Sequence, residues 1–195
     1  ITIDTRWGVP TFSEEFETET YAFNGQMFTL QPHRQMDIKR ETNREFFFRI
    51  SHDRTRIFRE GNSPKNYIWK EVFTNGTTRI YAPTAHDDKG NIIQWNLTKE
   101  TDRLGNFIEY AYEEKEGYAY LTEFRYTGFG SEKGVHKVVV KWADNQRSDI
   151  TTSARLGFMQ RYDILLAHIQ VFYYDESFRP YLFRYEKGAF SNRLL

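Results

Sequence analysis

The sequence predicts an all-β fold built from successive antiparallel hairpins. Aromatic residues make up 17% of the 195 residues, and aromatic side chains pack well on pleated surfaces. Asn-Gly or Gly-Asn pairs recur between runs that alternate apolar and polar residues, which is typical of hairpin turns. A unit of turn followed by aromatic strand also repeats, first around Gly90-Asn91 and again around Gly105-Asn106. Together these features favour hairpins laid side by side in an extended sheet.

The N-terminal third contains the first turn and strand signals. Trp7–Pro10 is predicted to turn, because proline fixes φ and restricts the residue before it. Tyr21–Phe28 carries a central Asn24-Gly25 and is expected to form a hairpin. Two further strands are predicted over Arg44–Ser51 and Thr55–Glu60, joined through residues 52–54.

The middle of the chain gives the clearest alternation. Tyr67, Trp69 and Phe73 fall on one face of a strand over residues 67–73. Asn75-Gly76 then turns the chain into Thr77–Tyr81. Beyond the two Gly-Asn units, one strand face is predicted to carry Tyr118, Tyr120, Thr122, Phe124 and Tyr126.

Towards the C-terminus, Val138, Val140 and Trp142 line one face of another predicted strand. Ile164–Tyr174 also fits a helical face, but its β-branched and aromatic content and its lack of helix caps favour a strand. Tyr181, Phe183 and Tyr185 alternate in a last predicted strand. Residues 191–195 are interpreted as the start of a linker.

Composition limits the classes of function. The chain has 27 basic and 27 acidic residues and no basic tract, so neither nucleic acid nor an anionic membrane is predicted as a partner. It contains no cysteine, which excludes disulfides, thiolate nucleophiles and cysteine-based zinc sites. Mean hydropathy is −0.73, and no apolar run is long enough for a transmembrane helix. We expect one β-rich domain over residues 1–195, cut from a longer polypeptide, because the chain starts without Met or a signal-like segment.

The sequence predicts no catalytic, cofactor-binding or metal-binding residue. No two of the histidines, His33, His52, His86, His136 and His168, have a short metal-ligand spacing. There is no nucleophile elbow, phosphate-binding loop or dinucleotide fingerprint. Asp87-Asp88 with Asn91 offers oxygen ligands for calcium, but the spacing does not match a calcium loop and turn chemistry explains these residues.

One acidic motif resembles a catalytic signature. Glu17-Thr18-Glu19 resembles the Glu-x-Glu of ADP-ribosyltransferases, in which one carboxylate binds ribose and the other orients the acceptor. No NAD-binding arginine or Ser-Thr-Ser-like strand precedes it, and it lies within an acidic run over residues 14–19. A solvated acidic face is therefore the favoured interpretation.

The residues expected to matter most are structural. Packing is assigned to Trp7, Trp69, Trp95, Trp142, Tyr110 and Tyr112. Turns are assigned to Gly25, Gly76, Gly90 and Gly105. The alternative is that rows of exposed Tyr and Trp form a binding surface for sugars or a protein partner.

Several segments, taken in order, resemble a known family. Thr5–Pro10 and then Glu19–Gly25 look like the N-terminal region of the Salmonella virulence plasmid B-type (SpvB-like) family, which is shared with the B component of Tc insecticidal toxin complexes and related to RHS/YD-repeat proteins. The resemblance covers nearly the whole chain and corresponds to the later part of that region. It continues through Ser63–Trp69, Asn75–Tyr81, Trp95–Asp102, Gly105–Tyr112, Phe124–Gly128, Arg155–Phe158 and Tyr181–Tyr185.

The resemblance implies an all-β segment of a large shell. In the toxin complexes, the B and C components form a hollow β-walled container around a toxic payload, and a β-propeller docks it onto a translocating A component. The virulence plasmid protein's ADP-ribosyltransferase is a separate C-terminal domain, so its catalytic residues do not carry over to this chain.

The resulting hypothesis is a non-enzymatic scaffold domain of a secreted bacterial toxin-complex or RHS-like protein. Its expected partners are other domains of the same long chain, an RHS-type C component or payload, and a translocating A component, with no membrane insertion by this segment. The alternatives are a β-rich module that binds a surface glycan or partner protein through exposed Tyr and Trp, and an enzyme whose site is assembled from distant residues.

Overall fold

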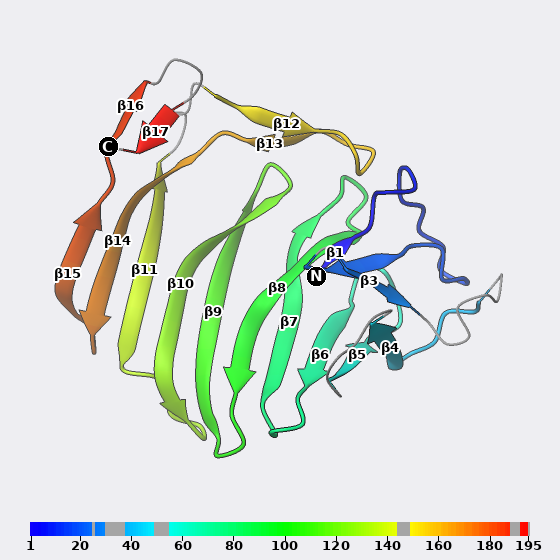
Figure 1. The fold of residues 1–195 in the computed structure, drawn as a ribbon, viewed down its shortest axis with the longest axis horizontal. Helices are drawn as coiled ribbons and strands as arrows, with labels where there is room; N and C mark the ends of the chain where they lie inside the picture. The colour runs from blue at the N-terminus through cyan, green and yellow to red at the C-terminus, as the bar shows by residue number, and fades with distance from the viewer. Residues whose placement is uncertain (25, 30–37, 49–54, 144–148, 188–191, 195) are drawn as a thin grey trace.

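The computed structural model describes residues 1–24, 26–29, 38–48, 55–143, 149–187 and 192–194. The named secondary-structure elements in these residues are all β-strands (Figure 1). Thirteen strands form one sheet, in which most strands pair antiparallel with the strand before them in sequence. The predicted all-β fold of successive antiparallel hairpins is confirmed. Within the described residues there is no helix that could cross a membrane.

The first eight strands close into a ring. Thr2 in β1 lies opposite Ala22 in β2 and also opposite Gln94 in β8, so β1 joins the two ends of this set. The ring contains β1 (Thr2–Ile3), β2 (Tyr21–Phe23), β3 (Gln26–Thr29), β4 (Arg44–Phe48), β5 (Arg56–Glu60), β6 (Ile68–Val72), β7 (Thr78–His86) and β8 (Ile92–Thr101).

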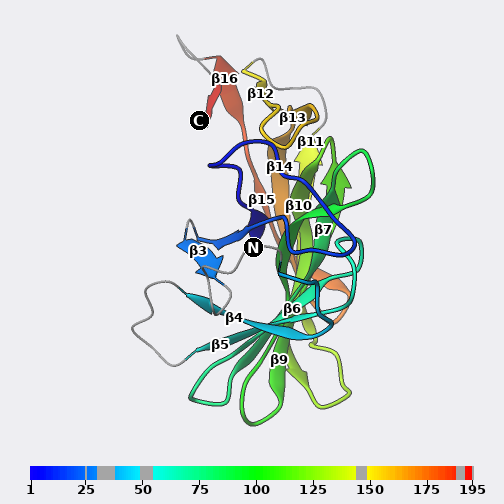
Figure 2. The same ribbon diagram turned by 90° about the vertical axis from the view of Figure 1, so that its right-hand side faces the viewer.

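The remaining strands of the large sheet continue from the ring as a single layer (Figures 1 and 2). They are β9 (Asn106–Lys115), β10 (Tyr118–Phe129), β11 (His136–Ala143), β14 (Leu165–Tyr173) and β15 (Glu176–Leu182). Two small hairpins are separate, one of β12 (Thr151–Ser153) and β13 (Gln160–Tyr162), the other of β16 (Tyr185–Lys187) and β17 (Asn192–Leu194).

Strand β8 belongs to both parts. Its C-terminal residues 99–101 pair with β9, whereas Gln94, nearer its start, pairs with β1. Where β8 and β9 diverge, side chains bridge them, since the Tyr112 hydroxyl donates a hydrogen bond to the Leu97 carbonyl at 3.1 Å. The sheet therefore splits along one edge of β8, one half closing the ring and the other continuing the open layer.

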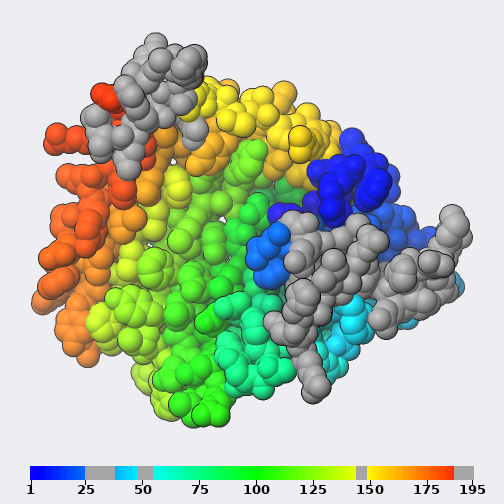
Figure 3. Space-filling view, in the orientation of Figure 1, coloured from blue at the N-terminus to red at the C-terminus, as the bar shows by residue number. Residues whose placement is uncertain are grey.

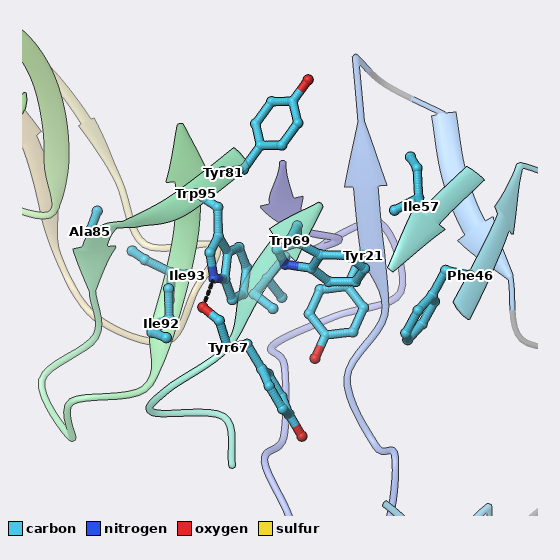
Figure 4. Close-up of a cluster of buried hydrophobic side chains, with 11 residues drawn as sticks. Tyr21, Phe46, Ile57, Tyr67, Trp69, Tyr81, Ala85, Ile92, Ile93 and Trp95 are labelled. Carbon is cyan, nitrogen blue, oxygen red and sulfur yellow. Dashed lines mark hydrogen bonds between the residues drawn. The ribbon is translucent and has the colours of Figure 1, made fainter. Parts of the chain in front are cut away.

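The hydrophobic core fills the ring (Figure 4). Trp69 and Trp95 are 0% and 1% exposed, and their ring centroids lie 6.0 Å apart in an edge-to-face arrangement. Tyr21 and Phe46 meet Trp69 edge-on at 4.8 Å and 4.9 Å. The Trp95 indole N–H donates to the Tyr67 carbonyl at 2.7 Å, so its polar atom is satisfied within the core.

The repeated Gly-Asn units form matching turns. Asp102 Oδ1 accepts the backbone N–H groups of Leu104 and Asn106, and its Oδ2 accepts the Asn106 side-chain amide. The turn between β7 and β8 repeats these bonds with Asp87 in place of Asp102. Gly105 has φ +90° and Gly90 has φ +79°, a left-handed backbone that favours glycine. The two Gly-Asn units that repeat in the sequence therefore also share the same pattern of turn hydrogen bonds.

The predicted shared face of Tyr118 to Tyr126 is wrong. Leu121 pairs with Tyr112 and Glu123 with Ala111, so β10 carries an extra residue, a β-bulge, between them. A one-residue insertion reverses the alternation of side chains. Tyr118 and Tyr120 therefore lie on the opposite face of the sheet from Phe124 and Tyr126.

The C-terminal predictions are partly wrong. Ile164–Tyr174 does contain a strand, β14, as favoured. Tyr181 and Tyr185, however, belong to two strands, because β15 ends at Leu182 and β16 begins at Tyr185. Residues 191–195 are not simply a linker, since residues 192–194 form β17 and pair with β16. Strands as short as three residues give too little periodicity to read from a sequence.

Candidate functional site

A buried ionic network lies beside the ring. Glu17 and Glu19 come from the irregular segment between β1 and β2, Arg40 precedes β4, and Arg59 is on β5. The side chains of Glu17, Glu19, Arg40 and Arg59 are 2%, 0%, 3% and 0% exposed. The interpretation of Glu17 and Glu19 as a solvated acidic face is therefore wrong.

All four carboxylate oxygens of the network accept hydrogen bonds. Arg59 donates to both oxygens of Glu17, with Nη1 to Oε2 at 2.8 Å and Nη2 to Oε1 at 2.5 Å. Arg40 donates to both oxygens of Glu19, at 2.6 Å and 2.8 Å. The Tyr21 hydroxyl also donates to Glu19, at 2.5 Å. Two carboxylates held this way by guanidinium groups are positioned to fasten the segment to the ring, not to bind ribose.

Aromatic rings complete the surroundings of Arg59. Its guanidinium carbon lies 3.9 Å from the centroid of the Tyr67 ring. Burial alone would lower the pKa of Arg59, but the hydrogen bonds and negative charge of Glu17 raise it above its ordinary value. Burial is also the main reason why the pKa of the Tyr21 hydroxyl is well above its usual value. Arg59 therefore stays charged and the tyrosine neutral.

The histidines do not gather. His33 and His52 lie outside the described residues. The ring nitrogen Nδ1 of His86 is 2.8 Å from Glu114, His136 stacks on Tyr126, and His168 is on β14. Across the described ranges, no group of three or more His, Cys, Asp or Glu side chains is placed to hold a metal ion. In the candidate calcium turn, Asp87 instead accepts hydrogen bonds from backbone and side-chain amides.

The assigned packing residues divide by burial. Trp69 and Trp95 are in the core as predicted, and the half-buried Trp142 donates its indole N–H to the Leu121 carbonyl at 2.8 Å. Tyr110 and Tyr112 are also half-buried. Trp7 is 79% exposed, so its packing role is wrong. Of the turn glycines, Gly76, Gly90 and Gly105 have positive φ, and Gly25 lies outside the described residues.

A row of rings crosses the open sheet. Tyr110 on β9 pairs with Phe124 on β10, and Tyr126 pairs with His136 on β11, which in turn pairs with Tyr173 on β14. Directly opposed residues share a face of the sheet. The Tyr126 and His136 rings stack with centroids 5.0 Å apart, and His136 lies 5.1 Å from Tyr173. All except the exposed Tyr173 are half-buried, so the row presents a partly accessible aromatic surface.

A cleft of about 490 Å³ lies between loops, where the segment after β1 meets the turns before β6 and β8. Phe12 is its one aromatic lining residue, and its charged lining residues are Glu14, Lys65, Asp87, Asp88 and Lys89. A sugar site normally offers a flat aromatic face together with placed polar groups. This cleft offers a single aromatic ring among charged, polar and aliphatic loop residues.

Known structures share this architecture over the whole chain. The N-terminal domain of effector protein SpvB from Salmonella typhimurium matches with a TM-score of 0.78 at 14% identity, covering 100% of this chain and 83% of that domain. The chain has the SpvB N-terminal fold. A chain of the TcdB2-TccC3-Cdc42 structure matches with a TM-score of 0.76 at 14% identity, and one of the Photorhabdus luminescens Tc holotoxin pore with 0.73 at 13%.

The extent of these matches differs. The chain covers 83% of the SpvB domain but spans only 12% of the length of each of the two Tc toxin chains, while 99% of the chain itself is matched. No family model matches the sequence, and no curated protein matches it. At this identity the shared property is the fold, consistent with the resemblance read from the sequence.

Proposed function

We propose that the chain is a non-enzymatic wall segment of a secreted bacterial toxin-complex or RHS-like protein, which helps to enclose or carry a toxic payload. The observation that carries this proposal is the layout of the sheet. One end of the strand order is closed by the ring, while the other continues as a single layer ending at β15. A closed end and an extendable end suit a piece of a larger wall.

The fold matches support the proposal. The structures that share the fold are an effector domain and parts of Tc toxin assemblies, in which the equivalent region is a small fraction of a long chain. The buried ionic network also supports it, because its carboxylates already accept hydrogen bonds from Arg40 and Arg59 and so hold two parts of the chain together. In this proposal the residues 1–195 act as one domain within a longer chain, together with an RHS-type component and a translocating component.

The first test is the complete reading frame and its neighbours. A downstream β-propeller with an RHS-repeat gene beside it supports a toxin shell. A transferase domain fused behind the region makes it the carrier part of a single-chain toxin. A frame that ends near Leu195 contradicts both.

The second test is physical. The complete gene product is purified with the RHS-type protein encoded beside it, imaged by electron microscopy and treated with trypsin. We expect a hollow particle that protects the C-terminal segment of the RHS-type protein until the particle is denatured. A solid particle, or digestion as fast as in the RHS-type protein alone, contradicts the wall role.

The alternative function is a binding surface for a glycan or partner protein, and the aromatic row is the observation that favours it. Two of the four tryptophans are not available for it, because Trp69 and Trp95 are buried. Weak saturable binding of an oligosaccharide, lost in the Tyr126→Ala variant and kept in a Trp7→Ala variant, would favour this alternative.

A further inference from the structure

One end of the large sheet can pair with a further strand. In the strand order, β1 stands at one end but pairs back onto β8, whereas β15 stands at the other end and, among the described strands, pairs only with β14. In Figures 1 and 3, β15 forms the left margin of the molecule. Closure of the ring therefore leaves β15 as the end of the order at which the sheet can grow.

Strand β15 is exposed and carries apolar side chains on both of its faces. All seven of its residues are exposed, and Phe178, Leu182 and Tyr181 retain 74%, 71% and 47% of their accessible surface. Leu182 lies opposite His168 and Tyr181 opposite Ile169, so consecutive residues place apolar surface on the two faces. Apolar surface gathered on one strand in this way is more than scattered exposed residues explain.

The backbone of β15 also limits what can pair with it. The Phe183 N–H donates to the Ala167 carbonyl at 3.0 Å, so by alternation the N–H of Tyr181 also points to β14 and that of Leu182 points to the free edge. The nitrogen of Pro180 points to the same edge but carries no hydrogen. A partner strand therefore gains a donor at Leu182 and none at Pro180.

A second copy of the chain is a poor partner for this edge. Antiparallel self-pairing centred on Pro180 leaves the central pair without a donor on either strand, and pairing centred on Arg179 sets two like charges against each other. Longer chains share this fold, since the matched Tc chains extend far beyond the equivalent region. A strand from elsewhere in a larger protein fits the edge better than a copy does.

We infer that β15 is extended by a β-strand from another part of the assembled protein. Apolar side chains of that strand cover Phe178 and Leu182. One of its backbone carbonyls accepts a hydrogen bond from the Leu182 N–H, and it needs no donor at Pro180. This inference rests on the proposed wall role. Pro180 and Arg179 act against self-association until that strand is in place.

Hydrogen exchange in the complete gene product tests the pairing. We expect the Leu182 amide to exchange at least about 100-fold slower than an unstructured amide, because it is bonded to the added strand. The Tyr181 amide, which points to β14, is the internal control for a folded β15. Protection of Tyr181 with unprotected exchange at Leu182 overturns the inference.

Matched charge substitutions give a second readout. Leu182→Asp places a charge where the added strand packs, whereas Leu104→Asp changes a 67% exposed leucine in the turn between β8 and β9. We expect Leu182→Asp alone to lower the melting temperature of the complete gene product and to speed exchange in its β15. Equal effects contradict the inference. If the particle is hollow and protects the RHS-type protein from trypsin but the Leu182 amide is unpaired, only the edge pairing is contradicted. If the Leu182 amide is paired but the particle does not protect that protein, only the wall role is contradicted.

Discussion

Arg59 and Glu17 form a buried ion pair between residues that are 42 positions apart in the sequence. Arg59 Nη2 lies 2.5 Å from Glu17 Oε1, and the two side chains are 0% and 2% exposed. The pair fastens the segment between β1 and β2 to the ring. The same acidic run also supplies Glu14 and Glu15, which remain exposed, so neighbouring carboxylates in one run have opposite environments.

Replacing Arg59 with alanine should destabilise the protein by about 3–5 kcal/mol, because Glu17 keeps a buried charge that has lost its main partner. Urea unfolding followed by far-UV circular dichroism measures this loss. Arg56→Ala is the matched control, since Arg56 is on the same strand and its pair with Glu45, at 2.8 Å, is in contact with solvent. We expect only a small change there. Equal losses in the two variants would mean that the network is not buried in solution.

Replacing Trp95 with phenylalanine should cost about 1–3 kcal/mol, because the buried Tyr67 carbonyl loses its hydrogen-bond donor. Trp7→Phe is the control, and at 79% exposure it should change stability by less than about 0.5 kcal/mol. Chemical denaturation of both variants gives the comparison. A Trp7 variant as unstable as the Trp95 variant would contradict the assignment of the core to the ring.

Replacing Gly105 with valine should cost about 1–3 kcal/mol, since a β-branched residue is strained at φ +90°. The nearest atom to an added Cβ is 3.7 Å away, so strain and not a clash is the cause. Gly105→Asn is the control and should be milder, because asparagine tolerates positive φ. An unchanged melting temperature in the valine variant would contradict the turn conformation.

Stability should fall as pH rises above about 10, the ordinary pKa of tyrosine. Burial raises the pKa of Tyr21, Tyr67 and Tyr81, and raises that of Tyr112 to about 12. The folded state therefore keeps protons that the unfolded state releases, so this contribution is complete below pH 10 and is lost as pH rises through the folded-state pKa.

Absorbance at 295 nm during an alkaline titration measures these tyrosines. We expect part of the tyrosinate signal to appear only above pH 11, together with the loss of far-UV circular dichroism. In Tyr112→Phe the fall in stability between pH 10 and 12 should be shallower, because one late-titrating group is gone. Ionisation of every tyrosine near pH 10 with the fold intact would contradict the buried environment.

The hairpins could be predicted because their determinants are local. Asp102, Gly105 and Asn106 define their turn within five residues, through a carboxylate that accepts neighbouring amides and a glycine at positive φ. The bulge in β10 could not be predicted, since no residue type marks Leu121–Glu123, and the two faces of that strand were therefore misassigned. The burial of Glu17 and Glu19 could not be predicted either, because their partners Arg40 and Arg59 are distant in sequence.

The sequence by itself determined the strand-and-turn order, because aromatic alternation and turn residues act over a few positions. Only the tertiary structure decided that β1 closes onto β8, that a charged network is buried beside the ring, and that β15 remains at the open end of the sheet. Those features depend on contacts between residues far apart in the chain. The free energy of such contacts depends on which groups are removed from water together, and local periodicity carries no information about which distant groups will meet.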